Sequence, residues 1–368
     1  MRADRLTFDG FRNLQKGECA LDPGVNILFG ENAQGKTNFL EVMWLFTGGK
    51  SFRGAKDREM VGFQADRAAI SLEFFAEERE QTAAITIRDR RSVTLNGIKQ
   101  PSPTRMTGRF CAVVFSPAHL SLVEDGPEQR RRFMDAAICQ LRPAYMPDLA
   151  AYTRVLRQRN ALLKEAQAGA VLPGDMLDVW DARLAQTGAA VFDARRRYWQ
   201  QLQPVTAGNY DGLSSGREQL QLRYVSAAGD EYTTPAEAAE HLLQTLLQRR
   251  AADRAAGFTT AGVHRDELEV LIDGQSARVY GSQGQKRSAV LALKLAEATL
   301  LRQATGEQPV MLLDDVMSEL DLSRQDYILN HIDGWQVMIT CCDPAPLRRL
   351  TKGRAFEVAH GEITQKDG

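Results

Sequence analysis

The stretch VNILFGENAQGKTNFLEVMWLF, residues Val25–Phe46, determines the fold. It opens with a short apolar run, Val25–Phe29, typical of a buried strand, and it closes with apolar residues at helical spacing. The loop between them fits the pattern G-x-x-x-x-G-K-[ST] and consists of Gly30, Glu31, Asn32, Ala33, Gln34, Gly35, Lys36 and Thr37. A strand, a glycine-rich loop and a helix in this order predict a phosphate-binding loop, or P-loop.

The chemistry of this loop points to a nucleoside triphosphate with magnesium. Glycines allow backbone amides to turn toward phosphate oxygens, and the start of a helix adds positive potential. We expect Lys36 to contact the β- and γ-phosphates and the Thr37 hydroxyl to ligate Mg²⁺. The alternative is a chance match in a glycine-rich turn, and the flanking strand and helix weigh against it.

A carboxylate for the metal is found much later in the chain, in PVMLLDDVMSELD. Val310–Leu313 is an apolar run that ends in Asp314 and Asp315, as in a buried strand with acids at its carboxyl end. We expect Asp314 to hold Mg²⁺, and Asp315 to orient or deprotonate the attacking water. Adjacent strand residues point to opposite faces, so this role requires the strand to end before Asp315. A helix cap in an acidic turn is the alternative.

The long separation between Lys36 and Asp314 indicates a large insertion. Residues 70–115 alternate as strands do, whereas residues 127–256 are rich in Ala, Leu, Arg and Gln and predict several helices. No heptad register crosses these helices, so no long coiled coil is expected. Breaks are expected at the prolines and glycines near residues 143, 147, 173–174, 204–216 and 235. Strands return from residue 261, and WQVMITCC and RAFEVAHG look like the last two.

A second glycine loop, Gly281–Gln285 in YGSQGQKRS, opens directly into a long apolar helix. Ser282 followed three residues later by Gln285 is the pattern of a helix capping box. A glycine-flanked helix start is also a potential second anion site. From the residues alone both interpretations remain open.

The chain as a whole resembles the RecF family of bacterial recombination-repair ATPases, which are relatives of SMC and ABC-type ATPases. The motifs that carry this resemblance are LTFDGFRNL, GENAQGKTN, KSFRG, FSPAHLSLVEDGPEQRRRFMD, AGVHRDEL, YGSQGQKRS and LLDDVMSELD. The resemblance implies an α/β fold: an ABC/SMC-type P-loop ATPase head with a mixed β-sheet, plus a mainly helical second lobe. The head would comprise residues 1–120 and 257–368, and the lobe residues 121–256.

The resemblance also implies further site residues. YGSQGQKRS looks like the ABC signature loop, which in a head-to-tail dimer closes on the γ-phosphate held by the other subunit's P-loop. SELD resembles the D-loop of the same interface, and Arg53 resembles an SMC-head arginine that reaches the phosphates. The residues expected to act across the dimer are Ser282, Gln283, Gly284, Gln285, Ser318 and Asp321.

The sequence departs from the ABC pattern at three points. Thr340 stands where transporter ATPases carry a switch histidine, VVFSPAHL lacks the expected glutamine (Gln129 is a poor substitute), and Asp315 replaces the usual glutamate. An aspartate is one methylene shorter and reaches the water less well. We therefore expect a weak, slow, DNA-dependent ATPase in which the nucleotide acts as a switch.

The family's function implies DNA as the main partner. An ATP-bound homodimer would clamp duplex DNA near single-strand gaps and, with RecO and RecR, help load RecA. Residues 127–200 hold twelve Arg/Lys against eight Asp/Glu, a modest basic excess suited to phosphate contacts. The arginines considered as DNA contacts are Arg130, Arg131, Arg132, Arg195, Arg196 and Arg197, with Arg154, Arg157 and Arg159 as a further cluster. A solvated helix face is the alternative for each cluster.

The composition limits the class of protein and the compartment in which it acts. The formal net charge is −1, with 43% hydrophobic and 25% charged residues, which is ordinary for a globular protein. Five cysteines without zinc-finger spacing suggest reduced thiols. The polar start MRADRLTFDG does not look like a signal peptide, and no apolar run approaches the roughly 18 residues of a membrane span. A cytoplasmic protein without membrane contact is expected.

Three other functions fit the sequence less well. A transporter ATP-binding subunit would place its signature much nearer the P-loop and would carry the glutamine loop and switch histidine. An SMC-type structural protein needs hundreds of heptad residues. A small-molecule P-loop kinase leaves the signature loop and D-loop unexplained.

Overall fold

The computed structural model describes residues 1–170, 176–229, 234–317, 320–344 and 353–366. Its contacts divide the chain into two compact units. The first unit comprises Met1–Leu120, Gly212–Ser215 and Val290–Gly368, and the second comprises Ser121–Asp211 and Gly216–Ala289. The chain leaves the first unit after Leu120 and returns to it for good at Val290.

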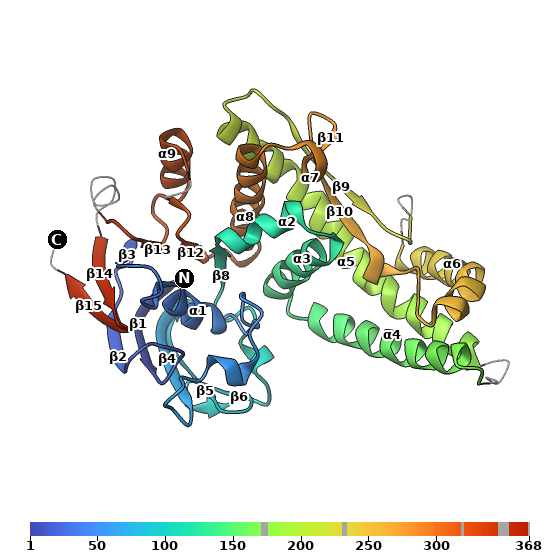
Figure 1. Cartoon of the computed structure of the whole chain (residues 1–368), viewed down its shortest axis with the longest axis horizontal. Helices are drawn as coiled ribbons and strands as arrows, with labels where there is room; N and C mark the ends of the chain where they lie inside the picture. The colour runs from blue at the N-terminus through green and yellow to red at the C-terminus, as the bar shows by residue number, and fades with distance from the viewer. Residues whose placement is uncertain (171–175, 230–233, 318–319, 345–352, 367–368) are drawn as a thin grey trace. The chain divides into compact units, whose positions relative to one another are not determined.

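The first unit contains a six-stranded sheet built around the P-loop strand. Its strands are, in spatial order, β15 (Glu362–Lys366), β14 (Gly353–Ala359), β3 (Val25–Phe29), β13 (Val337–Cys341), β12 (Val310–Asp314) and β8 (Ala112–Phe115). The five strands from β14 to β8 are parallel. Strand β15 is antiparallel to β14, and these two strands are red in Figure 1. Residues of β12 and β13 are all buried, as their continuous apolar sequences require. The carboxyl ends of β3, β12 and β13 therefore meet at one edge.

A second, antiparallel sheet belongs to the same unit. Its strands are, in order, β2 (Gly17–Ala20), β1 (Arg2–Asp9), β4 (Ala68–Ala76), β5 (Arg79–Ile87), β6 (Arg91–Leu95) and β7 (Ile98–Lys99). Helix α1 (Lys36–Leu45) joins one core with both sheets, and eight of its residues are buried. Phe39 of α1 meets Phe8 of β1 edge to face, with ring centroids 6.2 Å apart. The helix that follows the P-loop is thus fixed by packing.

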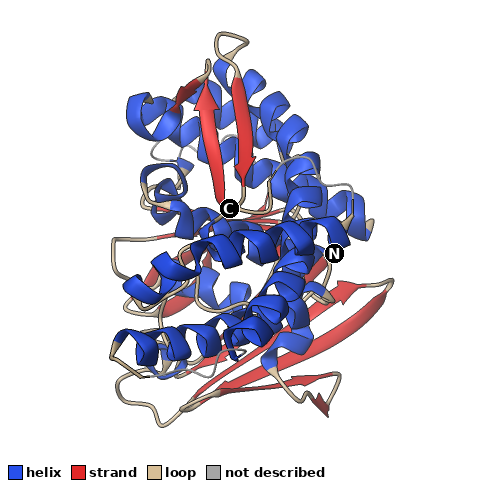
Figure 2. Ribbon diagram, turned by 90° about the vertical axis from the view of Figure 1, so that its right-hand side faces the viewer, coloured by secondary structure: helices blue, strands red, loops and turns tan. Residues whose placement is uncertain are grey.

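The second unit is mainly helical. Its helices are α2 (Ser121–Glu124), α3 (Pro127–Leu141), α4 (Tyr145–Gln167), α5 (Met176–Ser214, whose last residues belong to the first unit), α6 (Pro235–Ala256) and α7 (Ala277–Tyr280). A three-stranded sheet, β11 (Gln275–Ser276), β10 (Glu267–Ile272) and β9 (Leu220–Val225), lies among these helices (Figure 2). This sheet holds residues 267–276 in the second unit, because β10 pairs with β9 along its whole length.

Two helices complete the chain, and short 3-10 turns connect the elements. Helix α8 (Gln283–Thr305) starts in the second unit and continues into the first, and α9 (Leu322–His331) follows β12. The 3-10 turns are η1 (Asp57–Met60), η2 (Pro103–Met106), η3 (Pro117–Leu120) and η4 (Val263–Arg265). Among the described residues, no helix combines the length and apolar character needed to cross a bilayer.

The break expected within residues 204–216 is found at the end of α5, at Ser214, and not at Pro204, because α5 runs through this proline. A proline inside a helix removes one backbone hydrogen bond and disfavours the preceding turn. Leu202 and Thr206 on either side of it are fully buried, and earlier in the helix Trp199 donates its indole N–H to the Leu222 carbonyl of β9 at 2.9 Å. Packing of α5 on its neighbours therefore outweighs the local preference.

Candidate nucleotide-binding site

The P-loop joins β3 to α1 and needs glycine at both ends. Gly30 and Gly35 have φ angles of 151° and 123°, which side-chain-bearing residues rarely adopt. A Cβ at Gly30 would lie 2.2 Å from the Val358 carbonyl oxygen, and one at Gly35 would lie 2.9 Å from a Leu14 methyl group. The loop therefore packs closely against β14 and against the segment after β1.

Lys36 closes the P-loop on itself. Its Nζ donates to the carbonyl oxygens of Gly30 at 2.7 Å and Glu31 at 2.9 Å. Lys36 as a whole is only 7% exposed. The exposed Cys342, at the end of β13, places its Sγ 3.8 Å from the same ammonium group. The amine thus lies at the mouth of the loop, where the sequence predicted a phosphate contact. No pattern around Cys342 in the sequence predicts this position.

Thr37 and Asp314 come together as predicted for a metal site. Thr37 Oγ1 donates to Asp314 Oδ1 at 2.8 Å, and Thr340 Oγ1 donates to the same oxygen at 2.9 Å. Burial raises the pKa of Asp314 above its ordinary value, and the two hydroxyl donors partly offset this effect. A hydroxyl and a carboxylate oxygen are ligands suited to Mg²⁺, which retains waters and phosphate oxygens for its other positions.

The described residues contain no group of three or more His, Cys, Asp and Glu side chains that could enclose a metal. A cation at this site would therefore depend on one carboxylate, one hydroxyl and a bound nucleotide. Mg²⁺ sites in nucleotide-binding proteins are usually of this kind. The residues present fit magnesium in this role.

Asp315 meets the structural condition set for it. Strand β12 ends at Asp314, and Asp315 has a φ of 52°, so its side chain is not obliged to point to the opposite face of the sheet. Its backbone N–H donates to Thr340 Oγ1 at 2.8 Å. Thr340, fully buried, therefore connects both acids. Sequence reasoning noted Thr340 only for the histidine that it replaces.

Three further hydrogen bonds hold the P-loop from outside. Asn13 Nδ2 donates to the Ala33 carbonyl at 3.1 Å. Gln34 accepts at its side-chain oxygen from the His360 N–H at 2.6 Å and at its carbonyl from Gly361 at 3.1 Å, so the β14–β15 turn supports the loop. Asn13 lies within the quoted motif LTFDGFRNL, but the role of His360 had no sequence signal.

Arg53 lies beside this site. Its Nη1 donates to Asn38 Oδ1 at 2.8 Å, one residue beyond Thr37. Burial is the largest effect on the pKa of Asp314 and raises it. The positive charge of Arg53 acts in the opposite direction and lowers this pKa by a smaller amount. The side chain is exposed and has access to a bound phosphate.

The second glycine loop forms the capping box that its sequence allows. Ser282 N–H donates to Gln285 Oε1 at 2.8 Å, and Gln285 N–H donates to Ser282 Oγ at 3.2 Å. Gln283 and Gln285 also donate to Glu124 at 3.1 Å and Glu218 at 2.9 Å. The loop, with Gly284 at its centre, is thus held within the second unit, and Ser282 remains exposed. A capping role and a contact with another subunit are compatible.

The structure describes one of the two residues of the expected D-loop. Ser318 lies outside the described residues. Asp321 caps α9 by accepting at Oδ1 from the Arg324 N–H at 3.0 Å, and this bond lowers the pKa of Asp321. It is exposed to solvent.

Three of the arginines considered for DNA are buried, unlike that prediction. Arg130 is buried and donates from Nε and Nη2 to Glu267 at 2.6 and 2.7 Å. Arg195 is buried between Asp135, at 2.9 Å, and Asp266, at 3.0 Å. A guanidinium enclosed in this way has no access to a DNA phosphate, so these two predictions are wrong. Arg159 is also fully buried, with Asp181 and Asp253 as partners.

The neighbours of these two arginines differ in exposure. Arg132 and Arg197 have side chains that are 67% and 63% exposed, each in a surface pair one helical turn along its own helix. Arg196 is half-buried. These three residues, with Arg131, remain available as predicted DNA contacts.

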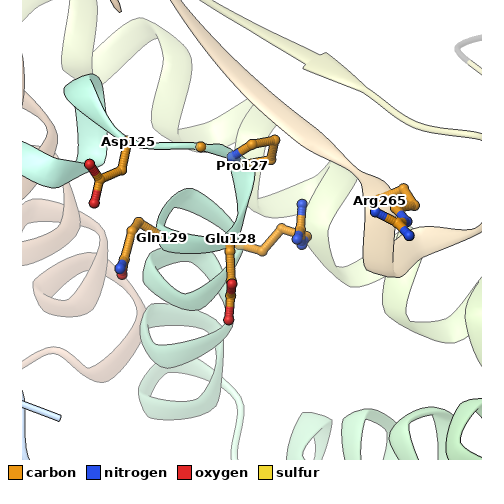
Figure 3. Close-up of a pocket in the computed structure, with 7 residues that line it drawn as sticks. Asp125, Pro127, Glu128, Gln129 and Arg265 are labelled. Carbon is orange, nitrogen blue, oxygen red and sulfur yellow. The ribbon is translucent and has the colours of Figure 1, made fainter.

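Arg131 lines a pocket of about 410 Å³ at the start of α3. The pocket is lined by Asp125, Gly126, Pro127, Glu128, Gln129, Arg131 and Arg265. Figure 3 shows Asp125 and Arg265 at opposite ends of this group. Arg131 Nη1 donates to the Asp266 carbonyl at 2.7 Å, and burial lowers the pKa of this guanidinium.

The fold and the site together define a P-loop head of the SMC and RecF class. The family described as RecF/RecN/SMC N terminal domain matches residues 3–352. The chain belongs to the RecF family. It is 38% identical over 365 residues to the DNA replication and repair protein RecF of Syntrophotalea carbinolica, covering 98% of each chain. It is 41% identical over 327 residues to that of a Synechococcus strain, covering 88% of this chain and 86% of the relative.

Solved structures agree with this assignment. The recombination mediator protein RecF of the RecFOR pathway, solved with ATP, has a TM-score of 0.92 and 34% identity, covering 100% of this chain and 98% of that chain. The Smc head bound to the C-winged helix domain of ScpA is 13% identical with a TM-score of 0.57, covering 100% of this chain and 98% of that chain, and indicates a shared fold alone.

Proposed function

We propose that this chain is an ATP-dependent DNA-binding protein of recombinational repair, in which ATP drives a head-to-tail homodimer. The observation that carries the proposal is the meeting of Thr37 with Asp314 at the mouth of the P-loop, at 2.8 Å. Membership of the RecF family, with a 34% identical relative solved with ATP, supports the choice of nucleotide.

ATP binding would rely on groups already near their working positions. The P-loop amides of residues 30–35 and the start of α1 attract phosphate oxygens. Lys36 would exchange its two loop carbonyls for the β- and γ-phosphates, because charge-assisted bonds to phosphate are about twice as strong as bonds to neutral acceptors. Thr37 and Asp314 would hold Mg²⁺, which supplies charge neutralisation to the phosphates when bound.

Hydrolysis would depend on Asp315, which follows the end of β12 and can orient a water or take its proton. Aspartate has a shorter reach than the glutamate common in related ATPases, and Thr340 carries no ring nitrogen to assist it. We therefore infer slow turnover, so that the ATP-bound state lasts long enough to act as a switch.

The dimer would be closed by the signature loop. Ser282 is exposed at the start of α8, a 23-residue helix whose first-turn amides can approach an anion. Facing another subunit's P-loop, Ser282 and Gly284 would enclose the γ-phosphate from the opposite side. Gln283, Gln285, Ser318 and Asp321 belong to the same proposed interface.

DNA would be the macromolecular partner of the ATP-bound dimer. Arg131, Arg132, Arg196 and Arg197 are the proposed phosphate contacts that remain after the burial of Arg130 and Arg195. Following its family, the chain would act in the cytoplasm near single-strand gaps, with RecO and RecR, to help load RecA. Hydrolysis stimulated by duplex DNA is part of this proposal.

Sedimentation and ATPase assays test the proposal together. With Mg-ATP the protein should sediment as a dimer, and with ADP or no nucleotide it should not. Duplex DNA should raise the hydrolysis rate, whereas a kinase would respond to a metabolite. Nucleotide-independent sedimentation together with a rate indifferent to DNA would contradict the proposed function.

A further inference from the structure

A buried carboxylate lies behind the P-loop and has no role in the mechanism described above. Glu41, on α1 one turn beyond Thr37, is fully buried. Arg12 donates to it from Nε at 2.6 Å and from Nη2 at 3.1 Å, and the Ser51 hydroxyl also donates to it. A charge buried without partners is costly, so this pairing is needed for the fold. It also fixes the position of Ser51.

Ser51 in turn anchors the backbone of the loop that carries Arg53. Its Oγ accepts from the N–H groups of Arg53 and Ala55, each at 3.2 Å. One hydroxyl therefore connects the buried Glu41 to two amides of this loop. The loop follows α1 directly and contains KSFRG, so its position is tied to the P-loop helix.

The side chain of Arg53 is held separately. Arg53 Nη1 donates to Asn38 Oδ1 at 2.8 Å, Asn38 Nδ2 donates to Asn13 Oδ1 at 2.6 Å, and Asn13 in turn reaches the P-loop carbonyl of Ala33. Because Arg12 and Asn13 are adjacent, the contacts close into a ring. We name this ring the Arg53 frame: Arg12, Asn13, Asn38, Glu41, Ser51 and Arg53.

We propose that Glu41 and Ser51 are positioning residues that aim Arg53 at the γ-phosphate, and that Asn38 holds the guanidinium until ATP arrives. This inference rests on the proposed binding of ATP. Asn38 offers a neutral acceptor, whereas a phosphate oxygen forms a charge-assisted bond about twice as strong. The phosphate would therefore take Arg53 from Asn38 without movement of the loop.

The frame predicts a specific energetic signature. Since Arg53 would meet only the γ-phosphate, loss of its position should weaken ATP binding and leave ADP binding nearly unchanged. Ser51→Ala removes the acceptor of two amides and one donor to Glu41. We expect about tenfold weaker ATP binding, the size of one good hydrogen bond.

The experiment measures ATP and ADP affinity by competition with a fluorescent ATP analogue. The variants are Ser51→Ala, Arg53→Ala and the double variant, with Ser51→Thr to restore the hydroxyl. Ser92→Ala is the matched control, since its hydroxyl donates to the Thr86 carbonyl between two strands away from the frame. Both single variants should bind ATP more weakly and bind ADP as the wild-type chain does. The double variant should lose no more ATP affinity than Arg53→Ala does.

The other outcomes would contradict either the positioning role of Ser51 or the proposed binding of ATP. Equal loss of ATP and ADP affinity in Ser51→Ala, or additive losses in the double variant, would overturn the positioning role. If Arg53→Ala binds ATP normally, the inference is wrong while ATP binding stands. If the wild-type chain binds neither nucleotide, the proposed function itself is wrong. Should Ser51→Ala fail to fold, Glu41→Gln keeps the shape of the buried group, and it must show a smaller loss confined to ATP.

Discussion

Thr37 and Asp314, 277 residues apart in the chain, share a hydrogen bond of 2.8 Å at the mouth of the P-loop. One follows β3 and the other ends β12, and the parallel β13 between them brings both to the same edge of the sheet. Thr340 of β13 donates to the same carboxylate oxygen at 2.9 Å. A hydroxyl and an acid that a P-loop protein needs for magnesium are therefore placed together by the sheet order.

Asp314→Asn should separate metal binding from nucleotide binding. The amide keeps the size of the side chain but removes the charge that attracts Mg²⁺. ATP affinity in the presence of magnesium should fall by about tenfold or more, the size of one charged hydrogen-bond partner. Affinity measured with EDTA should change little. Equal affinity of wild type and variant with magnesium would contradict the assignment.

The same carboxylate should make metal binding depend on pH. Burial raises the pKa of Asp314, so in the absence of metal this acid takes up a proton at higher pH than an exposed aspartate does. Its protonated form stabilises the free protein, and that contribution is lost as pH rises through the raised pKa. Mg-ATP affinity should therefore weaken as pH is lowered, and the affinity of Asp314→Asn should depend less on pH. Calorimetric titration across the acidic range measures both.

Asp315→Asn should preserve ATP binding and slow hydrolysis. Removing a general base typically reduces the rate by about 10²-fold or more, and the dimer formed with ATP should persist. Single-turnover hydrolysis with sedimentation at matched times measures both effects. Asp333→Asn, at an exposed position after α9, is the control and should match wild type. Wild-type hydrolysis by Asp315→Asn would show that another group handles the water.

The buried and exposed arginines of the second unit should behave in opposite ways. Arg195→Ala leaves Asp135 and Asp266 without their cation and should lower the free energy of unfolding by about 3–5 kcal/mol. Arg197→Ala, at a 63% exposed side chain, should change it by no more than about 0.5 kcal/mol. If Arg132 and Arg197 contact DNA, each substitution should also reduce the log–log salt slope of DNA binding by about 0.9. Denaturant titration and salt-dependent binding distinguish the two classes.

His264 should contribute to acid unfolding. Its ring lies within hydrogen-bonding distance of the Tyr152 hydroxyl, 2.7 Å, and of the Thr259 carbonyl, 3.0 Å, and burial lowers its pKa to about 4. An unfolded histidine titrates near 6.5, so the neutral ring stabilises the fold above that pH and the contribution is lost as pH falls toward about 4. His264→Gln should flatten the stability curve between these values. An unchanged curve would show that other groups govern it.

The parts of the fold and site that the sequence predicted are those with local patterns. The P-loop, the strand before it and the acidic end of β12 each lie within one short segment, and a strand ending at Asp314 follows from its apolar run. The burial of Arg130 and Arg195 could not be predicted, because it depends on Glu267, Asp135 and Asp266. Three adjacent arginines look alike in sequence, yet the helix turns only one of them into the core.

Other contacts were missed because they join segments with no shared pattern. Cys342 and His360 reach the P-loop only through the parallel pairing of β13 and β14 with β3. The passage of α5 through Pro204 depends on tertiary packing that no window of sequence contains. The signature loop differs, since the capping box that its sequence left open as one of two interpretations is present within the chain, while its proposed action on another subunit concerns a second copy.

Ser282 of one subunit is proposed to complete the nucleotide site of the other, and mixing two inactive variants distinguishes this role from a purely capping one. Lys36→Met should leave the P-loop unable to hold ATP, and Ser282→Arg should bind ATP at its own P-loop but fail to dimerise. In a mixed dimer, one site combines an intact P-loop from one chain with an intact signature loop from the other.

The decisive measurement is ATP-dependent sedimentation of each variant alone and of the equimolar mixture, with hydrolysis followed in parallel. If Ser282 acts across the dimer, each variant alone should remain a monomer and the mixture should partly recover the dimer. A purely capping role for Ser282 predicts only a loss of stability of about 0.5–2 kcal/mol and no recovery. Dimerisation of Ser282→Arg alone with ATP, to the extent seen for the wild-type chain, would rule out the contact across the dimer.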